Sequence, residues 1–322
     1  MITKKILIVL GEPNSTFSEI LSKYFKSKIF KQNKNIIILI GNKNLFEKQI
    51  KQLKYSLKIN EINDTQNASI KKINIININY KFRKPFTEIS QNSNTYIKNC
   101  FDLGLKLIIE KKADALINGP ISKKHFLKKK FPGVTEYIAN RTNSKEPVML
   151  IYNENLAVSP LTTHVPLKNV ARHIKKKKII NNILKIHNFY QKRLGKNPNI
   201  AVLGLNPHCE TTSKKISEER KEIIPAIKFL KKKKIKVDGP IAADTFFLKK
   251  NLKKFSVVLG MYHDQVLTPA KTLFEFEAIN ITIGLPFIKI TPDHGPNYEM
   301  IGQNKSDPSS IFYALNFLNK VK

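Results

Sequence analysis

The chain is poor in the residues that mark several specialised classes of protein. Its 322 residues include only two cysteines, Cys100 and Cys209, together with 12 glycines and 16 prolines. Two cysteines give no disulfide framework and suit a reducing compartment. So little Gly and Pro excludes collagen-like and low-complexity chains. No apolar run approaches the ~20 residues needed to span a membrane, so we expect a soluble, cytoplasmic protein with no membrane partner.

Acidic residues and arginines are also scarce. The formal net charge is +33, yet only five of the 57 basic residues are arginine. The lysines are spread along the whole chain with many Asn and Ile, the residues that AT-rich codons favour. A nucleic-acid-binding protein would gather Arg and aromatic residues in one motif or on one surface. We therefore interpret the lysine runs as solvated helix surfaces and expect no nucleic-acid partner, although the positive field would steer anionic substrates.

Short apolar runs alternate with longer amphipathic segments, a pattern typical of an α/β protein with a largely parallel sheet. The first run, 6–10, follows two lysines but is too short for a signal peptide, so it predicts a buried strand. Helices are predicted over 93–111, 167–192 and 216–233, and in the first of them apolar residues recur on one stripe. The other predicted strands cover 36–41, 73–79, 114–119, 148–152, 156–163, 200–205, 255–261 and 279–284.

Three histidines, His164, His208 and His263, each follow a predicted strand. They therefore stand at the carboxyl ends of hydrophobic strands, the edge at which open α/β sheets bind ligands. Three neutral imidazoles make a good site for Zn²⁺ or a similar cation and leave coordination positions open for substrate. Their separations along the chain fit no local metal motif, so ordinary histidines at loop starts remain the alternative.

Several segments combine Gly, Pro and a polar residue beside a predicted strand. A Gly-Pro step after a strand lets the backbone approach a ligand closely, so this many segments indicate a large cleft built from loops. The chain has no G-x-G-x-x-G after its first strand, no P-loop and no G-x-S-x-G elbow, and the residues alone do not point to a dinucleotide. The segments are NGPISKK at 118–124, PGVTEY at 132–137, LTTHVP at 161–166, LNPHCE at 205–210, GPIAADTFF at 239–247, YHDQ at 262–265, GLPFIK at 284–289 and DHG at 293–295.

Taken in this order, the segments resemble the 4-hydroxythreonine-4-phosphate dehydrogenase family of vitamin B6 biosynthesis, from about residue 113 to 302. The resemblance is strongest in LTTHVPL, GLNPHCE, GPIAADTFF, YHDQ and IGLPFIK. It implies a two-domain α/β/α subunit with largely parallel sheets, like isocitrate and isopropylmalate dehydrogenases. The first domain would comprise 1–135 plus 285–322. The second, 136–284, would hold the metal ligands and the contacts of a homodimer whose active site lies near the interface.

The resemblance also implies roles for particular residues. It makes the three histidines ligands of one divalent metal, Zn²⁺ or else Mg²⁺ or Co²⁺, which two subunits could share. Asp264 and Glu210, beside two of these ligands, are candidates for orienting them. The catalytic candidates are Asp244 and Lys271, and a metal-bound water is a third candidate for the general base. Substrate contacts fall on Thr135, Lys271, Asn280 and Lys289, and contacts to NAD or NADP on Asp293, His294 and Gly295.

The implied reaction is a metal-dependent, NAD-linked oxidation and decarboxylation of 4-phosphohydroxy-L-threonine to 3-amino-2-oxopropyl phosphate. The chain departs from the family pattern at several places. Its first loop reads GEPNSTFSE where the family has GEPAGIGPE, Val134 replaces a substrate-contacting His, and Lys289 replaces Arg. Pro296-Asn297 replaces a Thr-Ala pair, and Glu299 replaces Asp. Two alternatives therefore stay open: a dehydrogenase of phospho-threonate or phospho-erythronate, and an inactive scaffold that binds polyanions.

Overall fold

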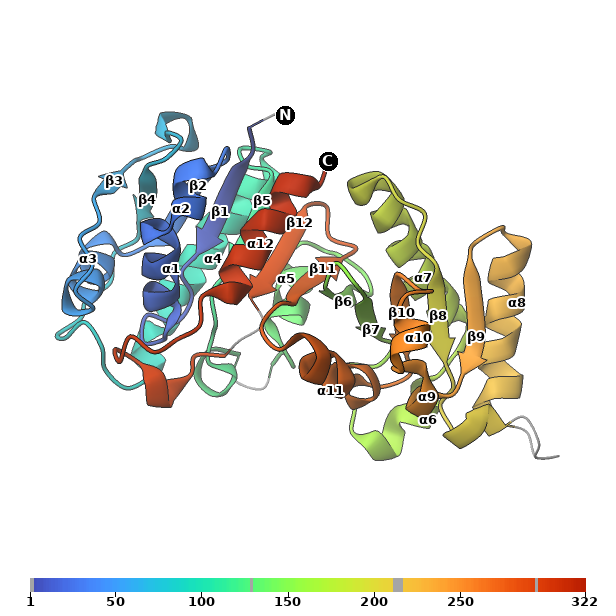
Figure 1. The fold of residues 1–322 in the computed structure, drawn as a ribbon. Helices are drawn as coiled ribbons and strands as arrows, with labels where there is room; N and C mark the ends of the chain where they lie inside the picture. The colour runs from blue at the N-terminus through green and yellow to red at the C-terminus, as the bar shows by residue number, and fades with distance from the viewer. Residues whose placement is uncertain (1–2, 128–129, 211–216, 293–294) are drawn as a thin grey trace. The chain divides into compact units, whose positions relative to one another are not determined.

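The computed structural model describes residues 3–127, 130–210, 217–292 and 295–322. The chain forms two compact units (Figure 1). Unit 1 comprises Met1–Lys145 and Leu285–Asn319, and unit 2 comprises Glu146–Gly284 and Lys320–Lys322. Both units are α/β, and the predicted fold class is confirmed. None of the helices in the described part of the chain combines the length and the apolar character that a membrane-spanning helix requires.

The sheet of unit 1 has the strand order β3-β4-β2-β1-β5-β12, and its paired strands all run parallel. Buried parallel strands need apolar side chains on both faces, and β1 and β2 meet this need with almost unbroken Ile, Leu and Val. The strands are β1 (Lys5–Val9), β2 (Ile36–Gly41), β3 (Ile59–Glu61), β4 (Ile73–Asn77), β5 (Ala115–Asn118) and β12 (Ile288–Pro292).

Helices cover both faces of this sheet. The stripe predicted within 93–111 forms α4 (Asn94–Ile109), and its buried Phe101 and Leu105 pack with Leu7 and Val9 of β1. Because side chains alternate along a strand, the neighbouring Ile6 and Ile8 face the opposite side, where α1 and α12 lie (Figure 1). The remaining bounds are α1 (Phe17–Lys26), α2 (Lys28–Gln32), α3 (Lys43–Gln52), α5 (Val134–Arg141) and α12 (Ser309–Lys320).

The sheet of unit 2 has the order β11-β6-β7-β10-β8-β9. Strand β6 runs antiparallel to both neighbours, whereas β7, β10, β8 and β9 pair in parallel. These four neighbouring parallel strands therefore end at one edge. The strands are β6 (Val148–Tyr152), β7 (Ala157–Pro160), β8 (Ile200–Leu203), β9 (Val237–Ile241), β10 (Val257–Gly260) and β11 (Ile279–Ile283).

One core of unit 2 lies between this sheet and α11. Val266 and Ala270 of α11 pack with Val158, Val258 and Leu203 from the three central strands, and all are buried. The helices of unit 2 are α6 (Val170–His173), α7 (Lys176–Phe189), α8 (Ile224–Lys232), α9 (Ala243–Phe246), α10 (Lys249–Leu252) and α11 (His263–Phe274).

Some predicted boundaries differ from the observed ones. The helix predicted over 167–192 is divided into α6 and α7, and the strands β3, β9 and β12 were not predicted. Residues 136–145, assigned above to the second domain, belong to unit 1. The reason is packing: Tyr137 and Ile138 of α5 are buried in the same core as α4.

Candidate active site

The three predicted metal-ligating histidines lie just beyond β7, β8 and β10, with His263 at the start of α11. Strand β10 pairs with both of the others, with Gly260 opposite Pro160 and Leu259 opposite Val202. Neighbouring strands in a sheet are about 4.8 Å apart, so the three loops begin side by side. The strand-end placement of His164, His208 and His263 follows directly from this topology.

Side chains from the predicted motifs hold this edge together. The buried hydroxyl of Thr162 donates to the carbonyl of Met261 at 2.8 Å, which ties the end of β7 to β10. The amide of Gln265 accepts from Met261 N at 2.7 Å and donates to the carbonyl of Gly204 at 2.8 Å, which ties β10 to β8. The LTTH and YHDQ segments thus supply the cross-links as well as the histidines.

His263 is the first residue of α11 and has an oriented ring. Its Nδ1 lies 2.7 Å from Oδ1 of Asp264. A carboxylate at Nδ1 accepts a hydrogen bond from that nitrogen and leaves Nε2 as the nitrogen available to a ligand, the arrangement common behind metal-bound histidines. His263 is 40% exposed, so Nε2 can be reached from solvent. The geometry agrees with the predicted orienting role of Asp264, whereas the side chain of Glu210 lies outside what the structure describes.

The loop that carries His208 is shaped by a buried carboxylate that the sequence did not reveal. Glu219 accepts hydrogen bonds from the backbone of Leu205 and Asn206, each at 2.8 Å, and from the Asn206 side chain at 2.9 Å. Burial alone would raise the pKa of the Glu219 carboxyl, but these hydrogen bonds outweigh it and hold the pKa below its usual range. An ionised Glu219 therefore fastens the loop just before the histidine.

His208 and Cys209 adopt left-handed backbone conformations, with φ of 53° and 58°. Both residues lie beyond β8 in a short turn. Their side chains are separated, because Cys209 is buried against Gly204 whereas His208 is exposed. Two successive left-handed residues cost energy, and here they turn the imidazole outward.

The donor chemistry at this edge suits a divalent metal, since it offers imidazole nitrogens with one ring already oriented. His164 and His208 are exposed and His263 is half-buried. Among the residues that the structure describes, however, no three His, Cys, Asp or Glu side chains of one chain are grouped closely enough to hold a metal ion. The three-histidine metal site remains a prediction.

The other predicted residues of unit 2 lie on elements next to this edge. Asp244 is exposed in α9, directly after β9. It is one of the charges that raise the pKa of Cys209, although burial is the larger cause, so its carboxylate lies near the His208 loop. Lys271 is exposed two turns after His263 on α11. Asn280 lies in β11, and within the described residues its buried Oδ1 has no hydrogen-bond partner, which points to a ligand or water there.

Unit 1 contains the remaining predicted substrate residues. Lys289 of β12 is fully buried, and its Nζ donates to the Thr291 hydroxyl at 2.5 Å, which in turn donates to Oδ1 of Asn118 at 2.9 Å. Burial lowers the pKa of Lys289 to about 7, and the charge of Glu136 opposes that shift. Thr135 is buried in the first turn of α5, next to Glu136.

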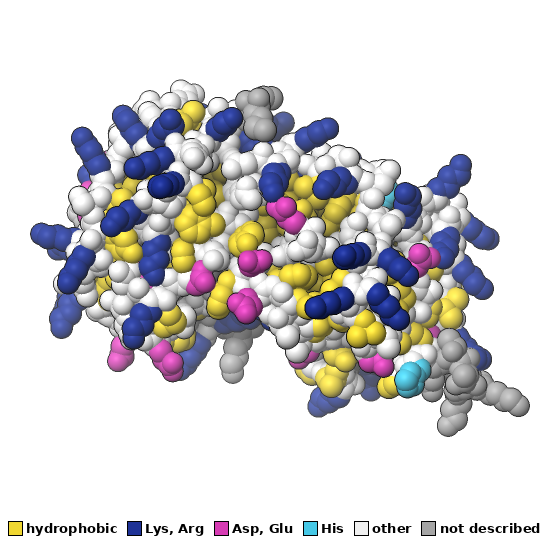
Figure 2. Space-filling model, in the orientation of Figure 1, with side chains coloured by type: hydrophobic (Ala, Val, Ile, Leu, Met, Phe, Trp, Pro, Cys, Tyr) yellow, Lys and Arg dark blue, Asp and Glu magenta, His cyan; other side chains and the backbone are white. Residues whose placement is uncertain are grey.

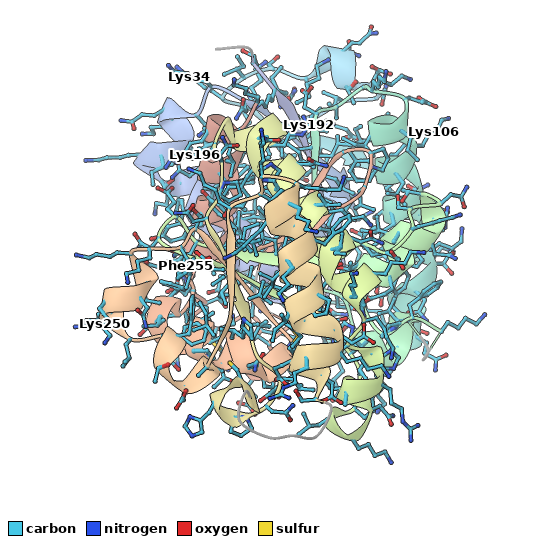
Figure 3. All side chains as sticks on the ribbon, turned by 90° about the vertical axis from the view of Figure 1, so that its right-hand side faces the viewer. Lys34, Lys106, Lys192, Lys196, Lys250 and Phe255 are labelled. Atoms are coloured by element: carbon cyan, nitrogen blue, oxygen red, sulfur yellow. The ribbon has the colours of Figure 1, made fainter. Side chains whose placement is uncertain are left out.

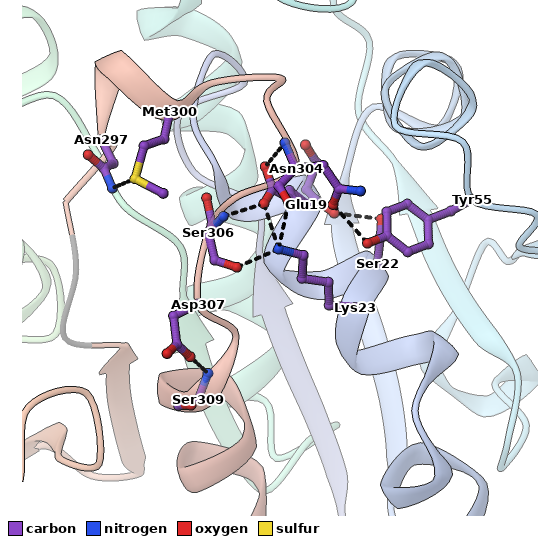
Figure 4. A network of polar contacts seen from close by, with 11 residues as sticks. Glu19, Ser22, Lys23, Tyr55, Asn297, Met300, Asn304, Ser306, Asp307 and Ser309 are labelled. Carbon is purple, nitrogen blue, oxygen red and sulfur yellow. Dashed lines mark hydrogen bonds and ion pairs between the residues drawn. The ribbon is translucent and has the colours of Figure 1, made fainter.

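The predicted cofactor loop follows β12. Asp293 and His294 lie outside the described residues, and Gly295 is the first described residue after them. The chain beyond Gly295 is held by Glu19 of α1, whose buried carboxylate accepts from Ser306 N, Asn304 N and Lys23 Nζ (Figure 4). Glu19 closes the GEPNSTFSE loop, so this acid has an anchoring role that the sequence analysis did not assign.

The first loop compensates for its missing glycines with hydrogen bonds. Asn14 is buried, and its side chain accepts from Thr87 N at 2.9 Å and from Thr87 Oγ1 at 3.1 Å. Glu12 is also buried; burial raises the pKa of its carboxyl to about 7, against hydrogen bonds from Asn14 N and Ser93 Oγ. Gly11 has φ of 73°, and an added Cβ would meet the carbonyl of Pro120 at 2.5 Å. The loop is therefore packed rather than open.

The fold and the strand-end loops together define a two-unit α/β protein with polar residues at the carboxyl edge of parallel strands. Residues 32–318 match the family "Pyridoxal phosphate biosynthetic protein PdxA". A protein named 4-hydroxythreonine-4-phosphate dehydrogenase from Sulfurihydrogenibium is 39% identical over 317 residues, 97% of this chain and 96% of the relative. The chain belongs to this family, and it is an oxidoreductase.

Further similarities bear on substrate and fold. A protein from Oceanobacillus iheyensis provisionally named D-threonate 4-phosphate dehydrogenase is 31% identical, over 96% of this chain and 95% of the relative. A crystal structure of a 4-hydroxythreonine-4-phosphate dehydrogenase from Burkholderia phymatum matches with a TM-score of 0.83 at 27% identity, covering 100% of this chain and 99% of the other. Isocitrate dehydrogenase from Methylococcus capsulatus has a TM-score of 0.50 at 10% identity over 98% and 85% of the two chains, a likeness of fold alone.

Proposed function

We propose that the protein oxidises and decarboxylates 4-phosphohydroxy-L-threonine to 3-amino-2-oxopropyl phosphate in pyridoxal phosphate biosynthesis. NAD⁺ or NADP⁺ would accept the hydride, and a divalent metal, Zn²⁺ or else Mg²⁺ or Co²⁺, would bind at the three histidines. The observation that carries the proposal is the edge formed by β7, β10 and β8, where three histidine-bearing loops begin side by side. Membership of the family supports it.

The metal ligands are proposed to come from two copies of the chain. The donors have suitable chemistry, yet the described part of one chain does not group three of them, and His164 and His208 are exposed. A second copy, in a homodimer, would complete the set. A divalent metal there would lower the pKa of the substrate hydroxyl and stabilise the negative charge that develops as carbon dioxide leaves.

The surrounding side chains have separate proposed roles. Asp264 fixes the ring of His263 through the bond to Nδ1. Asp244 and Lys271 are the two side-chain candidates for taking the hydroxyl proton. The unpartnered Oδ1 of Asn280 would accept a hydrogen bond from a substrate amine or hydroxyl. Hydride transfer itself needs the dinucleotide, for which Asp293, His294 and Gly295 are proposed contacts.

Lys289 and Thr135 are proposed to bind the anionic groups of the substrate. Lysine gives one compact charge in place of the planar fork of arginine, and Lys289 is already hydrogen-bonded through Thr291. Two donors, an ammonium and a hydroxyl, suit a phosphate or a carboxylate.

The test is to follow reduction of NAD⁺ or NADP⁺ by the purified protein with 4-phosphohydroxy-L-threonine as substrate. We expect activity that is lost in Asn280→Ala and in His263→Ala, with folding checked by thermal melting. If no reduced dinucleotide forms with this substrate while the folded, metal-supplemented protein is present, the assignment is wrong.

A second candidate substrate is D-threonate 4-phosphate. The relative named for that substrate supports it, as does Val134, which is half-buried against the core of unit 1 and cannot hydrogen-bond. The two acids differ at C2, which carries an amine in 4-phosphohydroxy-L-threonine and a hydroxyl in D-threonate 4-phosphate. A higher kcat/KM for D-threonate 4-phosphate, shifted toward phosphohydroxythreonine by Val134→His, would favour this candidate.

A further inference from the structure

Unit 1 has a hollow of about 500 Å³ at the carboxyl ends of its strands. Ligands of open α/β sheets bind at that edge. The segment after β4 forms most of its wall, and the loops after β1 and β2 contribute the rest. The lining residues are Asn14, Leu45, Tyr80, Lys81, Phe82, Arg83, Lys84, Thr87, Ser90 and Asn92.

The lining is cationic and contains no carboxylate. Lys81, Arg83 and Lys84 are exposed, and in the described parts of the chain none of the three forms an ion pair. By contrast Arg141, another of the five arginines, pairs with Asp102 at 2.6 Å. Hydroxyl and amide groups of Thr87, Ser90 and Asn92 add neutral hydrogen-bonding groups. Such a set of donors suits a phosphate.

The wall is held in place by buried amides. The side chain of Gln49 donates to the carbonyls of Pro13 and Pro85, each at 2.8 Å. Asn14 binds Thr87 twice and donates to the Glu88 carbonyl at 3.4 Å. Both amides are almost fully buried, at 3% and 5% exposure. The cations therefore stand on a fixed segment, and little ordering is needed when a ligand binds.

Aromatic rings stand beside the cations. The rings of Tyr80 and Phe82 are stacked, with centroids 6.4 Å apart and planes 14° apart. Lys48 Nζ lies 5.2 Å from the centre of the Phe82 ring. The same two aromatics line a second hollow of about 450 Å³, together with Lys48, Lys51 and one carboxylate, Glu47. Flat apolar surfaces next to fixed cations are the combination that binds a base and its phosphate.

We propose that this hollow, which we call the basic cleft, binds the phosphate of a nucleotide, with Arg83 and Lys84 on the phosphate and Tyr80 or Phe82 against the base. The nucleotide has two possible sources. One is the dinucleotide of the proposed function, in which case the extra phosphate of NADP sits in the cleft. The cleft lies close to the segment that follows the proposed cofactor loop, because Thr87 also lines a hollow together with Tyr298 and Ile301. The other is a free mononucleotide.

The test is isothermal titration of the full-length protein with NADP⁺, NAD⁺ and ADP at low and high salt. Arg83→Ala and Lys84→Ala are compared with Lys106→Ala, which removes the same charge from the exposed side of α4 (Figure 3). We expect at least one nucleotide to bind about tenfold more weakly in each cleft variant, and Lys106→Ala to bind like the wild type. Added salt should weaken that binding.

Comparison of the three nucleotides distinguishes the dinucleotide cofactor from a free mononucleotide. Tighter binding of NADP⁺ than NAD⁺, with the difference lost in Arg83→Ala, identifies the cofactor. Binding of ADP that neither NAD⁺ nor NADP⁺ displaces identifies a free nucleotide. If no nucleotide binds, or if the folded cleft variants bind all three as Lys106→Ala does, the proposal is wrong. The binding measurement needs neither metal nor turnover, so it can be interpreted even if the protein has no dehydrogenase activity.

Discussion

The amine of Lys289 lies fully buried on β12, opposite Leu116 of β5, at the position where the resemblance described above implies an arginine. Burial disfavours a charged amine, which is why its pKa falls to about 7. Lysine can lose its proton under these conditions and arginine cannot. The substitution therefore makes the charge at this position depend on pH near neutrality.

The sign of the pH effect follows from linkage. The folded pKa of Lys289 is lowered, so between about pH 7 and its unfolded pKa near 10.4 the unfolded chain binds more protons, and stability rises with pH. Lys289→Met removes this dependence. As the pH falls from about 10 to 7, we expect the wild type to lose stability relative to the variant by roughly 1.4 kcal/mol per pH unit. Denaturant unfolding across this range measures it; parallel pH profiles would contradict the assigned shift.

The carboxylate of Glu219 stabilises the fold in its charged form, whereas burial disfavours the charged form of Lys289. The folded pKa of Glu219 is lowered by the hydrogen bonds from Asn206 and Leu205, so its contribution is present above the unfolded pKa of about 4.3 and is lost as pH falls through the folded value. Glu219→Gln should cost about 1–3 kcal/mol at pH 7, because two backbone donors lose a charged acceptor. The cost should shrink below about pH 4. A stability loss no larger than that of the exposed Glu277→Gln would show that the carboxylate does not hold the loop.

At the scale of elements, the candidate site depends on cross-links between strands. Gln265 joins β10 to β8 through two hydrogen bonds, and Thr162 joins β7 to β10. These bonds connect loops whose starting points are already fixed by the parallel ladder. Their function is to set where the histidine-bearing turns leave the sheet.

Gln265→Ala should therefore affect the metal more than the fold. We expect a stability loss of about 1–2 kcal/mol and a metal affinity reduced about tenfold or more, because the positions of the His208 and His263 loops are no longer fixed. Competition with a chromophoric chelator measures the affinity. Gln52→Ala, at the exposed end of α3, is the control; equal metal affinity in the two variants would rule out the positioning role.

The elements show why the sequence predicted some features and not others. Strands such as β1 and β2 are long apolar runs, and the histidines were found because they follow such runs. Strand β12 was missed because Lys289 interrupts it, β9 because it contains Gly239-Pro240, and β3 because it is a three-residue strand. The anchoring roles of Glu219 and Gln265 could not be predicted, since Leu205 and Asn206 precede Glu219 by 14 and 13 residues and Gly204 precedes Gln265 by 61, so these contacts are formed only in the fold.

At the scale of the whole molecule, the charge is not gathered in one place. Lys and Arg side chains are scattered over the visible face of each unit, with Asp and Glu between them (Figure 2). Figure 3 shows Lys34, Lys192 and Lys250 among the many lysines on the outside of the ribbon. This pattern agrees with a compositional origin of the lysines, and the basic cleft differs because its cations surround a hollow.

Sharing of the metal between copies has a consequence for assembly. If two chains supply the histidines, removing the metal with a chelator should shift the protein toward monomer or lower its melting temperature, and adding Zn²⁺ should reverse the change. Light scattering coupled to size exclusion measures the mass before and after. A dimer whose mass and melting temperature are unaffected by chelation would contradict the shared site.

The three-histidine metal site is tested most directly by metal analysis of the purified protein and its single-histidine variants. We expect about one equivalent of divalent metal per site in the wild type, loss of that metal in His164→Ala, His208→Ala and His263→Ala, and retention in His173→Ala, an exposed histidine on α6. Absence of stoichiometric metal in the wild type, or equal retention in all four folded variants, would contradict it.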